Sequence, residues 1–314
     1  MEAIRGALSP RDPRVLRWLG DDAAVVDAGD RAVTSIDTMV DGVHFRLAGA
    51  AGGWASPADV GHRALAGALS DLAAMGALAG EAYVSLVLPE DMGEERALEL
   101  MRGAEALAGR CHTTICGGDV VSGPALVVTV AVVGWASATQ PLVGRDGAQP
   151  GDRLGVTGEL GAAGAALALL EDQVAPETVS PATREALLER LLRPRPRLQE
   201  GQQLAAAGAH AMIDLSDGLA ADAAQLARAS DVRIEIDLDA LPLANGVSAV
   251  AGELRRPGWW LGAGSGEDYE LCVCAAPGEE LAGVHWVGRV GEGEPRVLLS
   301  DHEGEQALTG YEHL

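Results

Sequence analysis

Residues 212–222, MIDLSDGLAAD, place three aspartates directly behind a short apolar run. The apolar residues predict a strand that ends near Asp214, and the residues after Gly218 predict a helix. Ligand crevices in α/β proteins form at the carboxyl ends of strands, so Asp214 and Asp217 are candidate ligand-binding residues. Each of them alone could instead be a turn former or a helix cap. Asp222 lies further along the predicted helix, where we expect a solvated carboxylate without a ligand.

The rest of the chain repeats this alternation, which predicts a mixed α/β fold. In the first half we expect strands at 81–89, 113–119 and 125–135, two strands joined by a turn within 23–37, and helices from Ser56 to about Ala74 and at 93–110. In the second half we expect strands at 153–158, 210–214, 233–238, 269–274 and 285–290, and helices from Gly161, before residue 193, at 198–207 and at 218–230. The 314 residues allow two hydrophobic cores. A polar loop follows at 144–152, and we expect the domain boundary near residues 136–145, which gives predicted domains 1–137 and 138–314.

The charge of the chain excludes several classes of function. Its formal net charge is −23, with 46 acidic and 23 basic residues, and every basic residue is an arginine. Nucleic acids and anionic membranes are therefore not expected as partners, because both require a basic surface. Without lysine the chain has neither a lysine-containing P-loop nor a Schiff-base lysine. The run Arg193–Arg197 (RPRPR) could be a docking motif, but prolines between two helices explain it better.

The cysteines have neither zinc-pair nor disulfide-framework spacing, with Cys111 and Cys116 in one pair and Cys272 and Cys274 in the other. We expect Cys272 and Cys274 on one face of a strand, as buried free thiols. The N-terminal residues lack a signal-peptide core, and no apolar run approaches about 18 residues. We therefore expect a soluble cytoplasmic protein.

Aspartates also recur beside predicted strands of the first half, at Asp22, Asp37 and Asp119. Asp71 lies within the first long predicted helix, on a face of small residues that includes Ala68, so we do not expect it on the solvated side. Carboxylates gathered in one crevice repel each other unless cations lie between them. Mg²⁺ binds one or two carboxylates together with phosphate oxygens, so the pattern favours a magnesium-nucleotide site. Phosphoryl transfer suits such a site, because it needs mainly positioning and charge neutralisation.

Other features have a functional and a structural interpretation. Gly117 and Gly118 could bring backbone N–H groups close to phosphate. The glycines at 158, 161 and 164 could serve a phosphate or only close helix packing. Arg145, in a glycine-rich loop, could clamp a phosphate or be solvated. The acidic turn GSGEDY, residues 264–269, is explained without a ligand by two solvated acids, and a single His44 is more often structural than catalytic.

Several motifs follow one another along the chain: GDDAAVV (20–26), SIDTMVDGVHF (35–45), LSDLAAMGA (69–77), GGD (117–119), GRDGAQPGD (144–152), IDLSDGLAAD (213–222), GEDYEL (266–271) and GYEHL (310–314). In this combination they resemble the thiamine-monophosphate kinase family over nearly the whole chain. Pieces like GDDAAV and DGL also occur in aminoimidazole ribonucleotide synthetase and selenophosphate synthetase, which are relatives of that family.

The resemblance implies two α/β domains like those of aminoimidazole ribonucleotide synthetase, the first dimerising through its sheet and the second closing over the ligands. It implies a homodimer that phosphorylates thiamine monophosphate to thiamine diphosphate with ATP and several Mg²⁺ ions, by direct in-line transfer. The metal ligands would be Asp22, Ser35, Asp37, Asp71, Asp119, Asp214 and Asp217, of which Asp37, Asp71 and Asp119 would be catalytic. ATP would contact Gly118, Asp119, Arg145 and Ser216. Thiamine phosphate would contact His44, Glu267 and Tyr311, with its thiazolium cation beside the carboxylate and the aromatic ring.

The chain departs from the family at a few positions. It has Arg63 where the family usually has Lys, Ala68 in place of Asn, Val120 in place of Thr, and Leu78-Ala79 where a Pro is usual. Ala68 and Val120 remove polar groups near the expected metals, whereas every aspartate expected to bind metal is present.

Two alternatives remain. An ATP-driven synthetase of the same superfamily is disfavoured, because selenophosphate synthetases carry a reactive Cys or selenocysteine near the N-terminus and the first cysteine here is Cys111. The purine enzyme is disfavoured by GEDYEL and GYEHL. The other alternative, a protein that binds nucleotide or thiamine phosphate without turnover, is supported only by Ala68 and Val120.

Overall fold

The computed structural model describes residues 2–18, 23–49, 52–279 and 281–308. The chain forms two compact units. The N-terminal unit comprises Met1–Leu72 and Ala77–Gln140, and the C-terminal unit comprises Ala73–Gly76 and Pro141–Leu314.

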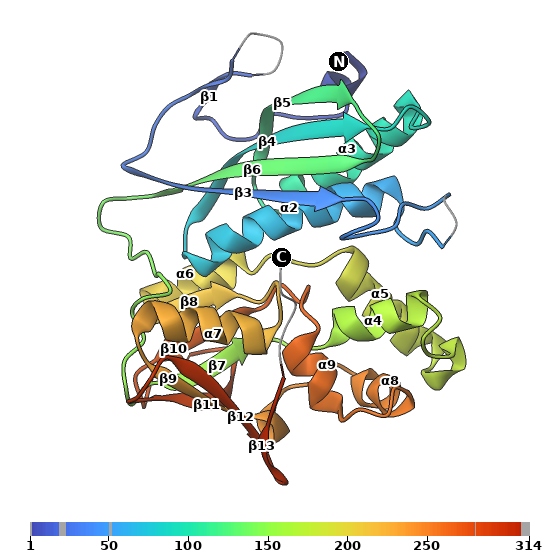
Figure 1. The fold of residues 1–314 in the computed structure, drawn as a ribbon. Coiled ribbons are helices and arrows are strands. Elements are labelled where there is room, and N and C mark those ends of the chain that lie inside the picture. Colours follow the sequence, from blue (N-terminus) through green and yellow to red (C-terminus); the bar gives the residue numbers. More distant parts are fainter. Residues whose placement is uncertain (1, 19–22, 50–51, 280, 309–314) are drawn as a thin grey trace. The chain divides into compact units, whose positions relative to one another are not determined.

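The N-terminal unit is built on a four-stranded sheet with strand order β3-β6-β4-β5. The strands are β3 (Arg31–Val40), β4 (Leu78–Leu88), β5 (Thr114–Ser122) and β6 (Val127–Ala136). Helices α2 (Pro57–Ala74) and α3 (Glu94–Arg110) lie along one face of the sheet in Figure 1. The unit also contains α1 (Glu2–Gly6) and the antiparallel pair β1 (Val15–Arg17) and β2 (Val25–Val26). Side chains of β6 are alternately buried and half-buried, as expected for a sheet that helices cover on one face.

Helix α2 begins where its sequence predicts. The Ser56 hydroxyl accepts the N–H of Asp59, and the Asp59 carboxylate accepts the N–H and the hydroxyl of Ser56, which is a reciprocal N-terminal cap. Gly61 of α2 and Gly103 of α3 lie against the backbone of the opposite helix, where a Cβ would collide with a carbonyl oxygen. This close packing fixes α2 and therefore the position of Asp71.

The C-terminal unit contains a seven-stranded sheet with strand order β13-β12-β9-β11-β7-β10-β8. Its strands are β7 (Arg153–Thr157), β8 (Ala211–Asp214), β9 (Arg233–Asp237), β10 (Leu271–Ala275), β11 (Val284–Gly291), β12 (Arg296–Asp301) and β13 (Gly304–Gln306). All neighbours pair antiparallel except β9 and β12. The helices are α4 (Ala162–Leu170), α5 (Pro181–Leu192), α6 (Leu198–Ala206), α7 (Leu219–Ser230), α8 (Val247–Glu253) and α9 (Gly258–Gly264), with 3-10 turns η1 (Pro176–Thr178) and η2 (Leu238–Ala240).

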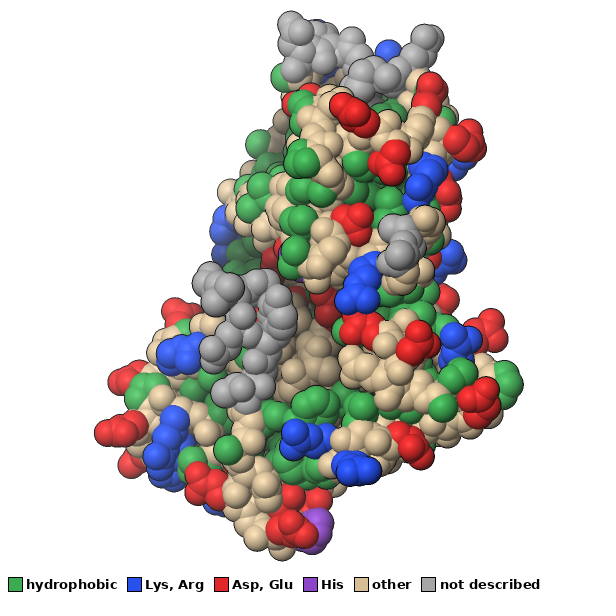
Figure 2. Space-filling view, turned by 45° about the vertical axis from the view of Figure 1, so that its right-hand side comes forward, with side chains coloured by type: hydrophobic (Ala, Val, Ile, Leu, Met, Phe, Trp, Pro, Cys, Tyr) green, Lys and Arg blue, Asp and Glu red, His purple; other side chains and the backbone are tan. Residues whose placement is uncertain are grey.

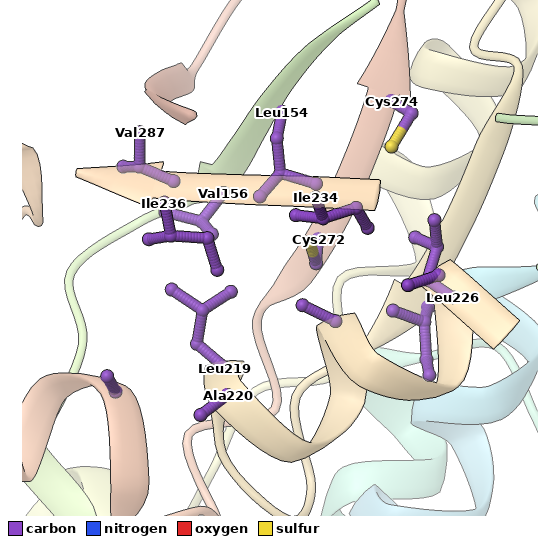
Figure 3. Close-up of a cluster of buried hydrophobic side chains, with 14 of the residues drawn as sticks. Leu154, Val156, Leu219, Ala220, Leu226, Ile234, Ile236, Cys272, Cys274 and Val287 are labelled. Carbon is purple, nitrogen blue, oxygen red and sulfur yellow. The ribbon is translucent and has the colours of Figure 1, made fainter. Parts of the chain in front are cut away.

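Strand β10 shows that both faces of this sheet are covered. Cys272 and Cys274 belong to a hydrophobic cluster with Leu219 and Leu226 of α7 (Figure 3), whereas Val273 belongs to a second cluster with α6. The prediction of buried free thiols at Cys272 and Cys274 is confirmed, and burial raises the pKa of both.

The predicted mixed α/β class is confirmed in both halves, and some local predictions are corrected. Strand β2 pairs with β1 and not with β3. The sequence places Asp37 and Asp119 at strand ends, but β3 continues to Val40 and β5 to Ser122, so both aspartates lie inside strands at the edges of the sheet. The sequence pattern did not reveal α8, α9, β12 or β13.

Surface properties agree with the composition. Figure 2 shows acidic side chains over the visible surface with arginines among them, in keeping with a net charge of −23. The RPRPR run joins α5 to α6, as the structural interpretation predicts. In the described part of the chain, no helix has the length and apolar character that a membrane span requires.

Candidate functional site

Ser35, Asp37 and Asp71 form an acidic group in the N-terminal unit. Ser35 and Asp37 are two residues apart on β3, so their side chains lie on the same face of the sheet. The Ser35 hydroxyl donates a hydrogen bond to the Asp71 carboxylate on α2. All three side chains are half-buried, and they offer the oxygen ligands that Mg²⁺ prefers.

The helix face around Asp71 is not solvated, as predicted. Residues 61–70 are all buried, and Ala68, one turn before Asp71, is fully buried. The methyl group of Ala68 cannot donate to Asp71, whereas the Ser35 hydroxyl does donate to this carboxylate.

Gly118 and Asp119 lie on β5, at the edge opposite β3. The register joins Asp37 to Val130, Val130 to Val84, and Val84 to Gly118, so three interstrand spacings, roughly 14 Å, separate the two edges. Asp119 is exposed and lies one residue beyond this row. The structure therefore does not bring Asp119 to Asp37 within one chain.

Glycine is required at Gly118. Its φ is +156°, and a Cβ there would collide with the carbonyl oxygen of Val84 on the neighbouring strand. The Asp119 carboxylate accepts the N–H of Val120 at 2.9 Å. The close approach of β5 to β4 thus explains why residue 118 is glycine without invoking a ligand. The backbone beside Gly118 is still accessible, because β5 is an edge strand.

Asp214 is the last residue of β8, and Ser216 and Asp217 lie in the predicted turn between β8 and α7. Asp214 is buried, and the other two are half-buried. Gly218 follows with φ +103°, and a Cβ there would press on the backbone of residues 263–266. The turn is therefore packed tightly against the end of α9 and the residues that follow it.

Asp222 contradicts the expectation of a solvated carboxylate. It is only 3% exposed, and its Oδ2 accepts the N–H of Asp217 at 3.1 Å. Burial and the charges of Asp214 and Asp217 raise its pKa to about 8. The sequence did contain a signal, because Asp222 lies three residues after Leu219 and therefore on the apolar face of α7.

Residues 266–270 pair with the turn after β8. The N–H of Glu267 donates to Ser216 O and that of Tyr269 to Leu215 O, both at 2.9 Å. Gly266, Glu267 and Tyr269 all have positive φ, of 64°, 61° and 49°. This conformation is uncommon for residues with side chains. The Tyr269 hydroxyl donates to the Glu267 carboxylate at 3.4 Å.

The expectation of two solvated acids in the 264–269 turn is wrong for Asp268, which is 8% exposed. Its oxygens accept the N–H groups of Gly161 at 2.7 Å and Ala163 at 3.4 Å, at the start of α4. Burial raises the pKa of Asp268 to about 7, although Gly161 and the nearby Arg190 act to lower it. The chain's own carboxylate thus occupies this helix N-terminus, which supports the packing interpretation of the glycine series.

Glu270, beside this turn, is buried in a polar network. Its carboxylate accepts the Thr157 hydroxyl at 2.8 Å and forms ion pairs with Arg190 at 3.0 Å and Arg197 at 2.5 Å. Arg197 is the last residue of the RPRPR run. The network therefore ties α5 and the α5–α6 connection to the start of β10.

His44 lies in the turn after β3 and is held by that strand and by α2. Its Nδ1 accepts the N–H of Val40 at 3.0 Å, so a neutral His44 carries its proton on Nε2. Its backbone carbonyl accepts a hydrogen bond from the guanidinium of Arg63 at 3.2 Å. Arg63 is buried and lies 5.4 Å from the Trp54 ring centre, so this departure from Lys places a cation beneath the His44 loop.

The remaining predicted residues are less constrained. Arg145 is exposed, which fits either interpretation given for it. Asp22 and Tyr311 lie outside the described residues. Among the residues whose placement is described, no three or more His, Cys, Asp or Glu side chains form a metal-binding group.

Two cavities are lined by other residues. One, of about 630 Å³, includes Arg14 and Trp135 in the N-terminal unit. The other, of about 580 Å³, includes Trp259, Trp260 and His302 in the C-terminal unit. Neither contains a residue that the sequence assigns to a ligand.

The chain is similar to known families in both halves. Residues 20–136 match the family model "AIR synthase related protein, N-terminal domain", and residues 149–294 match "AIR synthase related protein, C-terminal domain". The chain is therefore an AIR synthase-related protein with both domains of that class.

The whole-chain comparisons define the family more narrowly. The thiamine-monophosphate kinase of Mycobacterium tuberculosis is 39% identical over 98% of this chain and 87% of its own. The crystal structure of thiamine-monophosphate kinase from Stenotrophomonas maltophilia is 33% identical with a TM-score of 0.83, covering 98% of this chain and 96% of that one. The structure described as "AaThiL complexed with AMPPCP and TMP" is 30% identical with a TM-score of 0.81, covering 95% of this chain and 92% of that one. The chain belongs to the thiamine-monophosphate kinase family.

Proposed function

We propose that this chain phosphorylates thiamine monophosphate with ATP and forms thiamine diphosphate. The observation that carries the proposal is membership of the thiamine-monophosphate kinase family over nearly the whole chain. A similar protein binds AMPPCP, an ATP analogue, together with TMP, which supports the same two substrates here. A terminal phosphate oxygen of thiamine monophosphate attacks the γ-phosphorus of ATP in line, and ADP leaves with the electrons of the broken P–O bond.

The chain's own residues bind and orient the two substrates. Ser216 and Arg145 supply donors to ATP, and the backbone at Gly118 can approach a phosphate closely because no Cβ intervenes. The Glu267 carboxylate pairs with the positively charged thiazolium ring. His44 and Tyr311 complete the thiamine phosphate contacts by motif.

The residues present fit Mg²⁺. Burial raises the pKa of Asp222, and the charges of Asp214 and Asp217 raise it further; a cation bound between these carboxylates would relieve their repulsion. Ligands would come from Asp214 and Asp217 in the C-terminal unit, and from Ser35, Asp37 and Asp71 in the N-terminal unit, with Asp22 and Asp119 added by motif. When bound, magnesium neutralises negative charge on the transferring phosphoryl group.

We also propose that the protein is a homodimer in which the two copies associate through their N-terminal units. Residues 138–314 then form the domain that closes over the ligands. Within the described residues, β3 and β5 each pair on one side only. If β3 of one copy pairs with β5 of a second, Asp37 and Asp119 come to neighbouring strands. This arrangement would resolve their separation within one chain. A cytoplasmic location stays a prediction.

A non-catalytic binder is the alternative that specific residues favour, because Ala68 and Val120 lack the polar groups usual in the family. Coupled release of ADP from ATP, with thiamine monophosphate and Mg²⁺, separates the possibilities. We expect turnover that depends on thiamine monophosphate. Tight binding of both ligands without ADP release would favour the binder, and turnover only with a purine intermediate would rule out the kinase.

A further inference from the structure

Asp268 lies at the centre of the segment that carries Glu267, yet no step of the transfer uses it. Both of its oxygens bind backbone N–H groups at the start of α4, a helix of nine residues. Such N–H groups have no partners within the helix. A buried side chain therefore fastens this segment to a helix that lies far away in the sequence.

The backbone on either side of Asp268 requires such support. Glu267 and Tyr269 have left-handed φ values of 61° and 49°, which persist only where the surroundings determine them. Their N–H groups bind the carbonyls of Ser216 and Leu215. The bonds of Asp268 lie between these two, so the segment is held at three successive residues.

We propose that Asp268 is a positioning residue, which holds Glu267 in the orientation that contacts thiamine phosphate by fastening the 266–269 segment to the start of α4. The inference rests on the proposed function, because the substrate contact of Glu267 is part of that proposal. Asp268 acts through Glu267, whose carboxylate also accepts the Tyr269 hydroxyl at 3.4 Å.

The test measures KM for thiamine monophosphate and for ATP in Asp268→Ala, Asp268→Asn, Glu267→Ala and the double alanine variant. Asp268→Ala should raise KM for thiamine monophosphate by about tenfold, with KM for ATP nearly unchanged. Asp268→Asn keeps one oxygen that can accept the N–H of Gly161. It should raise KM for thiamine monophosphate by less than Asp268→Ala does, again with KM for ATP nearly unchanged. The double variant should match Glu267→Ala, because Asp268 acts through Glu267. Additive effects, or equal rises for both substrates, overturn the proposal.

Asp152→Asn is the matched control. Asp152 is 3% exposed, accepts the N–H of Gln149 at 2.9 Å and pairs with Nδ1 of His210 at 3.0 Å. It precedes β7, whereas the N–H groups that Asp268 binds follow β7. This control should leave the ratio of the two KM values unchanged. If Asp268→Ala does not fold, the test compares Asp268→Asn with Asp152→Asn. A ratio of the two KM values that is unchanged in Asp268→Asn overturns the proposal.

Hydrogen exchange separates this inference from the proposed function. In the absence of substrates, Asp268→Asn should exchange faster than wild type at residues 161–163 and 266–269 together. Unchanged exchange in both segments overturns the proposal, whatever the activity. A wild-type chain that does not phosphorylate thiamine monophosphate would refute the proposed function, and the exchange result would still decide whether Asp268 holds the segment.

Discussion

Asp222 adds negative charge behind the two aspartates that we assign to Mg²⁺ in the C-terminal unit. Its hydrogen bond to the N–H of Asp217 also fixes that ligand. Asp222→Asn keeps a hydrogen-bond acceptor but removes the charge. We expect this variant to weaken the affinity for Mg²⁺ by about tenfold, as the loss of a residue that supports a metal ligand commonly does. Half-saturating Mg²⁺ should be measured at pH 8.5, above the Asp222 pKa of about 8.

The control for this prediction is Asp231→Asn. Asp231 is exposed at the other end of α7, with a φ of 56° that asparagine tolerates, so the same charge change occurs on the same helix. If both variants shift the Mg²⁺ requirement equally, the effect of Asp222 is only one of net charge.

Asp268 should also make stability depend on pH. Its pKa is about 7 in the folded state, against an ordinary value of 3.8 in the unfolded chain, so the folded state favours the protonated form. That contribution is complete below about pH 4 and is lost as pH rises to about 7. Relative to Asp268→Asn, which does not titrate, the wild-type free energy of unfolding should fall across this window by at most about 4 kcal/mol. Arg190 and Glu270 face the group with opposite effects. Urea unfolding at a series of pH values measures the difference, and a difference that rises with pH would contradict the assignment.

At the scale of secondary-structure elements, Glu270 joins α5, the α5–α6 connection and β10. It is 1% exposed and pairs with two arginines, so Glu270→Gln takes this counterion from the partly buried Arg190 and leaves Arg197 with Glu200. We expect a loss of about 3 kcal/mol in the free energy of unfolding. Glu200→Gln removes a more exposed partner of Arg197 and should cost less than about 1 kcal/mol. Chemical unfolding of both variants tests this, and equal losses would show that the network does not depend on burial.

Elements were predictable from sequence where the pattern was long. Helices α2, α3 and α7 have enough turns for an apolar periodicity to emerge, whereas α8 and α9 have only seven residues each. The hairpin of β12 and β13 is short and partly exposed, so it has little apolar signal.

The candidate site was predictable in composition but not in its contacts. The aspartates follow motifs, and the apolar spacing around Asp222 could have revealed its burial. The bond of Asp268 to Gly161 spans 107 residues of sequence, so no local pattern contains it. The separation of Asp37 from Asp119 depends on strand order, which follows from pairing across the whole sheet.

At the scale of the whole molecule, apolar exposure is concentrated in one unit. The large hydrophobic side chains that are exposed among the described residues are Leu16, Val25, Ile36, Val43, Leu78 and Val121. All of them lie in the N-terminal unit, and Ile36, which is 68% exposed, points away from the face covered by α2. Within the described residues the edge strands of this unit's sheet pair on one side only, and an apolar surface beside such edges favours association of two copies there.

Such a dimer predicts complementation between inactive variants. If Asp37 of one copy acts with Asp119 of the other, an Asp37→Asn chain mixed and reassembled with an Asp119→Asn chain forms dimers with one intact site and one doubly damaged site. Equal mixing makes about half of the dimers mixed, with one of two sites intact, so about a quarter of wild-type ADP release should return. The control is Asp37→Asn mixed with Asp71→Asn. Asp71 bonds to Ser35 on the strand that carries Asp37, so both changes affect the same half-site and activity should not return. Recovery in the control, or none in the first mixture when mass spectrometry shows mixed dimers, would mean that Asp37 and Asp119 do not act across two chains.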